Sequence, residues 1–276
     1  MLDVMGQAKN AIEAYNSALR VSLSNMANLE TSGYKRLNVS FQSIFEKVLS
    51  QGTAAEDNMG GTNPRQYGQG VSISSVTLDF SAGTTTSAGP LNLAISGQGL
   101  FLVSPDGGKS FLYTRSGDFQ LDGSGNLISS SGMQVYGLDE SDNLVPITGL
   151  TSNIYTTNLL SWTDAGELAE FTGTDYKNVS RKTKYRIAMT YFHNPAGLVQ
   201  AQGTSFAETL ASGSPAIAQS IGGSVGTIAP RQLEKSNVDQ FSESLSAQEL
   251  SRAISANLSM VKLASDMISS FIQKLG

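Results

Sequence analysis

Each end of this 276-residue chain carries a narrow apolar stripe with helical spacing, and these stripes constrain the fold more than any other feature. Near both termini, apolar residues recur at alternating steps of three and four, as on one side of a long helix. The first stripe holds Met5, Ala8, Ile12, Tyr15, Leu19, Ser22 and Met26, and the second holds Ala247, Leu250, Ile254, Asn257, Val261, Ala264, Ile268, Phe271 and Leu275. The spacing predicts two terminal helices that each need a partner along one side.

Two arrangements of these helices fit the pattern. They can form an antiparallel pair that closes an ordinary domain, or a coiled-coil-like pair that packs against copies of the same chain. Asn257 is the polar residue on the second stripe, and a single Asn at such a position can fix the register of packed helices. Ser236-Asn237 or Asp239 supplies the N-cap of the second helix.

Between the predicted helices, the apolar spacing changes from helical to a period of two. Apolar residues alternate in the runs 76–80 and 185–192, and turn residues such as Asp106-Gly107-Gly108 separate shorter runs between them. This pattern predicts an antiparallel β meander or sandwich. The fold class is therefore α+β, with N- and C-terminal α-helices and an antiparallel β-rich middle domain. Trp162 is predicted to be a core anchor.

Composition excludes several classes of function. The net charge of −5, with no run of basic residues, argues against a nucleic-acid surface. The chain has no cysteine, which excludes disulfides and thiolate metal sites. No apolar run approaches the ~20 residues that span a bilayer. The N-terminus lacks a basic region followed by an apolar one, so we expect no cleavable signal peptide.

No group of residues in the sequence assembles a catalytic site. His193 is the lone histidine and flanks a turn, so a histidine triad or metal cluster lacks support. The oxygen-rich stretch 139–143 lacks the full calcium-loop pattern, and Gly97-Gln98-Gly99 is followed by a strand rather than by a phosphate-binding helix. We therefore expect no enzyme activity and no catalytic, cofactor or metal site.

Several short motifs, in order along the chain, resemble those of the bacterial flagellar rod and hook family. SNMANLETSGYK at 24–35 is similar to the family's N-terminal signature, and GGTNP at 60–64, YTRSGDF at 113–119 and LEKSNVD at 233–239 are similar to later motifs. The residues that match are Asn25, Ala27, Asn28, Thr31, Gly33, Tyr34, Lys35, Gly60, Gly61, Thr62, Asn63, Pro64, Ser236, Asn237, Val238 and Asp239. Ser24 stands where the family has Asn.

The resemblance implies a subunit of a helical tube in which the N- and C-terminal helices form a coiled-coil-like inner domain that makes the inner wall. It implies an N-terminal helix at 1–32, a linker with extended β structure at 33–80, a β-rich outer domain at 81–222 with a reduced insertion at 139–178, a return linker at 223–240 and a C-terminal helix at 241–276. The residues expected to carry self-assembly are Met5, Ile12, Tyr15, Leu19, Met26, Leu250, Ile254, Asn257, Val261, Ile268, Phe271 and Leu275.

Within this family, the GGTNP motif favours a hook subunit, which would polymerise into a curved tube that transmits motor torque to the filament. A distal-rod or other rod subunit of the basal body is the alternative, and a secreted β-rich carbohydrate-binding module or enzyme is a third interpretation. The resemblance implies as partners other copies of the chain, the distal rod protein, the hook cap and hook–filament junction proteins, and the flagellar export apparatus. It also implies an extracellular place in the flagellum, without nucleic acid or membrane insertion.

Overall fold

The computed structural model describes residues 2–44, 47–52, 54, 60–151, 154–222 and 225–275. The chain divides into two compact units. The helical unit comprises Met1–Met26, Leu37–Thr77 and Asp239–Gly276, and the middle unit comprises Ala27–Arg36 and Leu78–Val238. None of the described helices is both long and apolar enough to cross a bilayer.

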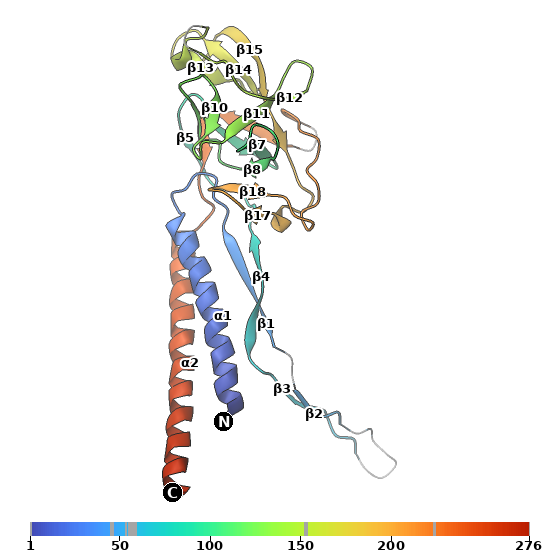
Figure 1. Cartoon of the computed structure of the whole chain (residues 1–276), viewed down its shortest axis with the longest axis vertical. Helices are drawn as coiled ribbons and strands as arrows, with labels where there is room; N and C mark the ends of the chain where they lie inside the picture. The colour runs from blue at the N-terminus through green and yellow to red at the C-terminus, as the bar shows by residue number, and fades with distance from the viewer. Residues whose placement is uncertain are drawn as a thin grey trace. The chain divides into compact units, whose positions relative to one another are not determined.

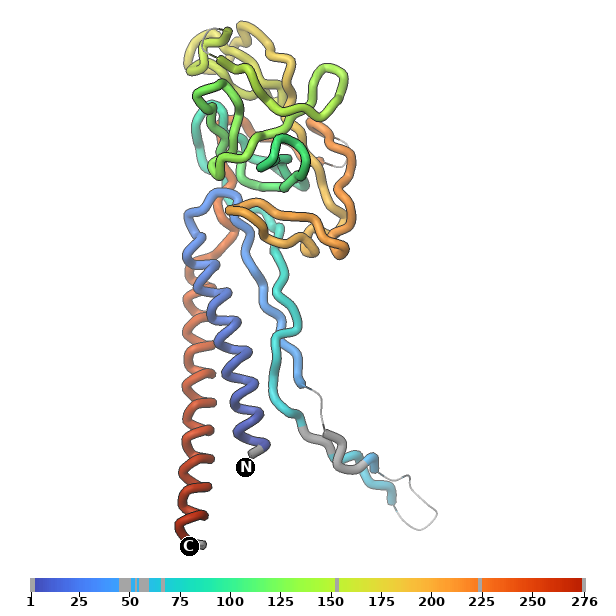
Figure 2. Tube along the Cα trace, viewed as in Figure 1, coloured from blue at the N-terminus to red at the C-terminus, as the bar shows by residue number. Residues whose placement is uncertain are grey.

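Two long helices, α1 (Leu2–Ala27) and α2 (Gln240–Leu275), form most of the helical unit and confirm the predicted terminal helices. They run antiparallel, so both chain ends lie at the same end of this unit (Figures 1 and 2). Ser22 Oγ donates to the Glu243 carboxylate, and Asn25 Nδ2 donates to it at 3.1 Å. These bonds join the C-terminal part of α1 to the N-terminal part of α2. Coiled-coil packing of the pair remains a prediction.

The N-terminus of α2 is capped by a side chain, as the sequence predicts. Asp239 Oδ2 accepts a hydrogen bond from the backbone N–H of Ser242 at 3.1 Å, and the Ser242 hydroxyl donates to the same oxygen. An N-cap carboxylate satisfies one of the amide groups that the first helical turn leaves without an intrahelical acceptor. Of the two candidate caps, the structure therefore selects Asp239.

A two-stranded ribbon completes the helical unit. β1 (Leu37–Ser43) pairs with β4 (Val71–Leu78), and β2 (Lys47–Ser50) pairs with β3 (Arg65–Tyr67). The ring of Phe41 packs edge-on against the ring of Tyr15, with centroids 5.7 Å apart. Gln7 Nε2 donates to the carbonyl of Gly68 at 2.9 Å. These contacts tie the ribbon to α1.

An antiparallel sheet of twelve strands dominates the described part of the middle unit and confirms the predicted β-rich middle (Figure 1). Its longest path runs β13-β14-β15-β11-β7-β8-β18-β17, and its other strands pair at the sides of this path. The strands are β7 (Leu100–Ser104), β8 (Leu112–Thr114), β9 (Phe119–Leu121), β10 (Leu127–Ser129), β11 (Gln134–Leu138), β12 (Leu144–Pro146), β13 (Leu160–Trp162), β14 (Glu167–Phe171), β15 (Val179–Ile187), β16 (Met189–Thr190), β17 (Val199–Gln200) and β18 (Ser205–Ala207), with short 3-10 turns η1 (Thr157–Leu159) and η2 (Pro195–Gly197).

The core of the middle unit includes Trp162, as predicted. Its side chain is 2% exposed, and its indole Nε1–H donates to the carbonyl of Leu91 at 2.8 Å. Leu160, Leu168 and Ile187 are fully buried in the same apolar cluster. Strands β12, β13 and β14 all come from the region 139–178, so that region contributes to the main sheet of the middle unit.

Two further pairs of strands return the chain toward α2. β19 (Thr227–Pro230) pairs antiparallel with β6 (Leu93–Ser96), and β20 (Gln232–Glu234) pairs antiparallel with β5 (Thr85–Ser87). Residues 223 and 224 of the predicted return linker lie outside the described residues. The pairing places Glu234 beside a segment about 150 residues earlier in the chain, since Glu234 is in register with Thr85.

Candidate functional site

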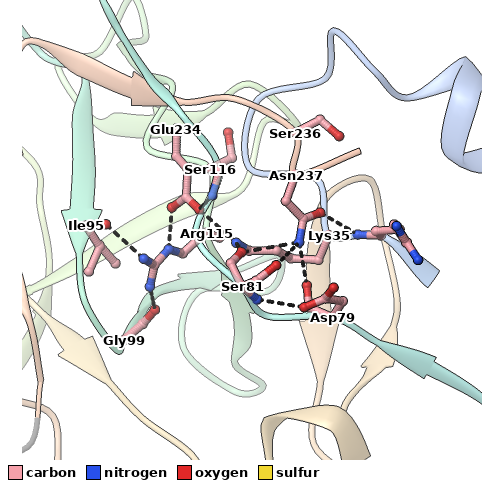
Figure 3. A network of polar contacts seen from close by, with 12 residues as sticks. Lys35, Asp79, Ser81, Ile95, Gly99, Arg115, Ser116, Glu234, Ser236 and Asn237 are labelled. Atoms are coloured by element: carbon pink, nitrogen blue, oxygen red, sulfur yellow. Dashed lines mark hydrogen bonds and ion pairs between the residues drawn. The ribbon is translucent and has the colours of Figure 1, made fainter. Parts of the chain in front are cut away.

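A buried ionic cluster brings together charged residues from three of the motifs noted in the sequence (Figure 3). Lys35 Nζ lies 2.7 Å from Glu234 Oε1, and Arg115 Nε donates to Glu234 Oε2. The side chains of Lys35 and Glu234 are each 1% exposed, and that of Arg115 is 5% exposed. Lys35 Nζ also donates to the carbonyl of Ser81 at 2.7 Å, and Gly83 N donates to Glu234 Oε1 at 2.9 Å. Buried charges persist when they are paired and hydrogen-bonded in this way.

The turn Gly97-Gln98-Gly99 and the strand before it supply the remaining acceptors for Arg115. Arg115 Nη1 donates to the carbonyl of Gly99 at 2.6 Å, and Nη2 donates to the carbonyls of Ile95 and Gly97, each at 2.8 Å. Gly97 and Gly99 have φ values of 102° and 140°, which residues with side chains rarely adopt. The glycines of this turn therefore let its carbonyl oxygens face a guanidinium group, which is the opposite polarity from a phosphate-binding loop.

The electrostatics of this cluster follow from burial and from the arrangement of its charges. Burial lowers the pKa of Lys35 below its ordinary value and outweighs the attraction of Glu234, which acts in the opposite direction. Burial pushes the pKa of Glu234 upward, but the charges of Arg115 and Lys35 outweigh it and hold that pKa below its ordinary value. Asp79 also favours the charged form of Lys35. Glu234 is therefore the central anion of the cluster.

Asn237 forms a second set of polar contacts beside the ionic cluster (Figure 3). Its Oδ1 accepts a hydrogen bond from Arg36 N at 2.8 Å. Its Nδ2 donates to the carbonyl of Asp79 at 2.8 Å, to the Ser81 carbonyl at 3.2 Å and to the Ser81 hydroxyl at 3.0 Å. One amide side chain thus bonds to two separate segments of the middle unit.

Gly33 provides the turn that leads into Lys35, and its φ is positive. Its φ is 70°, and its N–H donates to the carbonyl of Glu234 at 2.8 Å. A Cβ atom at this position would lie 2.3 Å from Ser116 N, which is too close for any side chain. Glycine is therefore required here both by conformation and by space.

The other motif residues lie in several environments. Asn25, in the helical unit, accepts from Leu37 N and donates to the Leu37 carbonyl, each at 3.0 Å. Thr31 Oγ1 donates to Asn28 Oδ1 at 3.3 Å. Tyr34, Ser236 and Val238 are buried, Ala27 is exposed at the end of α1, Asp239 caps α2, and Gly60, Gly61, Thr62, Asn63 and Pro64 are exposed.

The residues expected to carry self-assembly lie on the helices at half-buried and exposed positions. Met5, Ile12, Tyr15, Leu19 and Met26 are half-buried on α1, as are Leu250, Ile254, Asn257, Val261 and Ile268 on α2, while Phe271 is 62% exposed. The side chain of Leu275 lies outside the described residues. The fully buried face of α1 consists instead of the small residues Ala8, Ala11, Ala14, Ala18, Ser22 and Asn25. The assembly role of the larger residues stays a prediction.

A second apolar stripe runs along α2 and is exposed to solvent in the isolated chain. Met260, Leu263, Met267 and Phe271 follow one another at steps of three and four and are between 51% and 62% exposed. Such a continuous apolar face is uncommon on a monomer and is typical of a protein interface.

The three candidate chemical sites from the sequence have ordinary structural explanations. His193 is exposed in a bend three residues after β16 ends, with its ring centroid 5.4 Å from that of Tyr191. Asp139 Oδ1 accepts from Ser141 N at 2.8 Å and from Asn143 N at 2.9 Å, so the carboxylate closes its own turn. Among the described residues, no group of three or more acidic or histidine side chains is placed to hold a metal ion.

The ionic cluster was only partly accessible to sequence reasoning. Lys35 and Asn237 are among the predicted motif residues, and the structure brings both to the cluster. Arg115 and Glu234 stand in quoted motifs but were not singled out as site residues. The available signal was that each is a charged residue beside short apolar strands, where an unpaired charge is costly.

Comparisons with known proteins agree with this arrangement of motifs. Residues 94–158 match the model of the flagellar hook protein FlgE/F/G D1 domain. The flagellar basal-body rod protein FlgG of Bacillus subtilis is 28% identical over 277 residues, covering 99% of this chain and 98% of that protein. The chain is thus similar to flagellar rod and hook proteins. The FlgG protein of Agrobacterium fabrum is 29% identical and covers 95% of each chain.

Hook proteins of the family match a smaller part of this chain. The flagellar hook protein FlgE of Helicobacter mustelae is 35% identical over 144 residues, which is 51% of this chain and 32% of that protein. The relatives in these comparisons are named as flagellar rod and hook proteins rather than as enzymes.

Proposed function

We propose that this protein is a structural subunit of the flagellar basal-body rod. The observation that carries the proposal is coverage: rod relatives align over nearly the whole of both chains, whereas the hook relative aligns over about half of this chain and a third of its own length. A hook subunit of that size has a large part with no counterpart here. This favours the alternative from the sequence over its main interpretation.

The helical unit supports a role in polymerisation. The exposed stripe at Met260, Leu263 and Met267 leaves apolar surface in water that contact with another copy would cover. Identical subunits that contact one another through two different faces can add further copies in the same way. They form a ring if the rotation between neighbours closes, and otherwise they build a helical tube. We propose copies of this chain as the main partners, and neighbouring rod and hook proteins at the ends of the tube.

The hook remains a second candidate, because the local identity to a hook protein is the higher one. The matching segment is 35% identical to the Helicobacter mustelae protein, against 28% for the Bacillus subtilis rod protein over the full length. The exposed GGTNP segment at 60–64 also resembles the hook motif. In either case we propose that the protein lies in the flagellar axial structure.

Electron microscopy of basal bodies from a strain lacking this gene separates the two candidates. Rods that end early, with no hook, would support the rod assignment. Complete rods that lack only the hook would overturn it in favour of the hook. Intact flagella would contradict both. Restoration of the wild-type gene is the control, and it should return complete basal bodies in the same strain.

A further inference from the structure

The connections between the two units converge on one place inside the middle unit. The chain enters the middle unit at Ala27, leaves it after Arg36, re-enters it at Leu78 and leaves it again after Val238. We name the adjoining stretches the first segment (33–36), the second segment (79–83) and the third segment (234–237). These stretches adjoin three of the four places where the chain passes between the units.

Each of the three segments is hydrogen-bonded to both of the others. The first bonds to the second where Asp79 N donates to the Arg36 carbonyl at 2.8 Å and Lys35 Nζ donates to the Ser81 carbonyl. The first also bonds to the third through Lys35 and Glu234. The second bonds to the third where Asn237 Nδ2 donates to the carbonyls of Asp79 and Ser81. The segments therefore form a closed set of contacts.

Releasing the third segment alone would remove hydrogen bonds from both of the other segments. Moving the third segment away removes an acceptor from Arg36 N, a donor from the Asp79 carbonyl and the anion from Lys35. The Lys35–Glu234 pair is fully buried, and a buried charge without its counterion is costly, while the partly buried bonds of Asn237 add a smaller contribution. The loss of one segment therefore favours the loss of the other two.

We propose that Lys35, Glu234 and Asn237 form a clamp that makes the three connecting segments open and close as one cooperative element. The clamp distributes any force that reaches the middle unit over three chain segments rather than one. The inference concerns the single chain, and it holds whether the protein builds a rod or a hook.

Hydrogen exchange of the full-length protein, read by mass spectrometry of peptides, tests the clamp. In Asn237→Ala, we expect faster exchange in all three segments together, including the amides of Arg36, Asp79 and Gly83, with the buried strand β7 still protected. Asn143→Ala is the matched control, because the Asn143 side chain donates within its own turn, to the Asp139 carboxylate at 3.3 Å. It should leave all three segments unchanged.

Two outcomes would overturn the proposal. Faster exchange in the third segment alone would show that the segments open independently. If Asn237→Ala also exposed β7, the comparison would be repeated with Asn237→Asp, which keeps an oxygen to accept from Arg36 N but has no amide to donate to Asp79 and Ser81. Exposure of β7 in that variant too would mean that the contacts are inseparable from the global fold, and no separate clamp would exist.

Discussion

Replacing Glu234 by glutamine should unfold the middle unit at a markedly lower temperature than the wild type. The substitution keeps the size of the side chain and one oxygen, but it removes the negative charge between Lys35 and Arg115. The side-chain amide of glutamine would also place N–H groups against the groups that donate hydrogen bonds to the Glu234 carboxylate in the wild type. Two cations then remain almost fully buried, with the partly exposed Asp79 as their nearest acidic neighbour in this network.

The size of the effect can be worked out from burial. Removing one partner of a buried ion pair costs about 3–5 kcal/mol, because the remaining charge is left uncompensated. For a unit of this size, each kcal/mol lowers the melting temperature by about 2–4 °C. We therefore expect Glu234→Gln to lower the Tm by roughly 6–20 °C.

Thermal unfolding followed by circular dichroism measures this difference, and Glu167→Gln provides the control. Glu167 pairs with Lys182 at 2.6 Å, but the Lys182 side chain is 63% exposed. A solvent-exposed pair contributes about 0–1 kcal/mol, so the control should lose a few degrees at most. Equal losses in the two variants would refute the reasoning, because burial of the cluster would then make no difference to its strength.

Three further predictions concern the glycine turn, acid pH and assembly. Gly33→Ala should destabilise the protein by more than about 1 kcal/mol in denaturant titration, because its φ is positive and its Cβ would meet Ser116 N; an unchanged midpoint would contradict this. The folded-state pKa of Glu234 is depressed, so its stabilisation is complete above the unfolded value near 4.5 and is lost as pH falls through the folded pKa. In denaturant titrations below about pH 4.5, the free energy of unfolding of the wild type should therefore fall more steeply with pH than that of Glu234→Gln. Ile254→Asp should abolish polymerisation in sedimentation assays while the β signal remains, whereas Ser255→Asp, on an exposed position of α2, should still assemble.

Periodicity in the sequence predicted the helices well but predicted only part of their packing. On α2, the positions of the predicted stripe from Ala247 to Ile268 are those that the structure covers partly or fully. On α1, Ala8 and Ser22 of the predicted stripe lie on the buried face, but the larger residues of the stripe are half-buried beside it, and most of the buried face is alanine. A search for large apolar residues overlooks such a face, because small side chains mark close approach of a neighbour rather than hydrophobicity.

Local sequence patterns could not predict the ionic cluster, because its members come from distant parts of the chain. Lys35 and Glu234 are 199 residues apart, and Arg115 lies between them in sequence. Periodicity and turn chemistry act over a few residues, so they can indicate that each charge adjoins a strand but not which charges meet. The pairing of β20 with β5 decides that, and strand order is set by the whole middle unit.

The predicted motif residues and the exposed stripe of α2 should respond differently to mutation, since they occupy different environments. Gly33, Lys35 and Asn237 are committed to contacts inside the middle unit, so substitutions there should first affect its folding or local opening. Leu263 and Met267 lie on the exposed stripe, and both side chains leave more than half of their surface in water. Substituting them should change the free energy of unfolding of the isolated chain little and should weaken assembly instead. A family motif and an assembly surface are therefore separable in this protein, and variants that assemble poorly must be sorted by monomer stability before a contact between subunits is inferred from them.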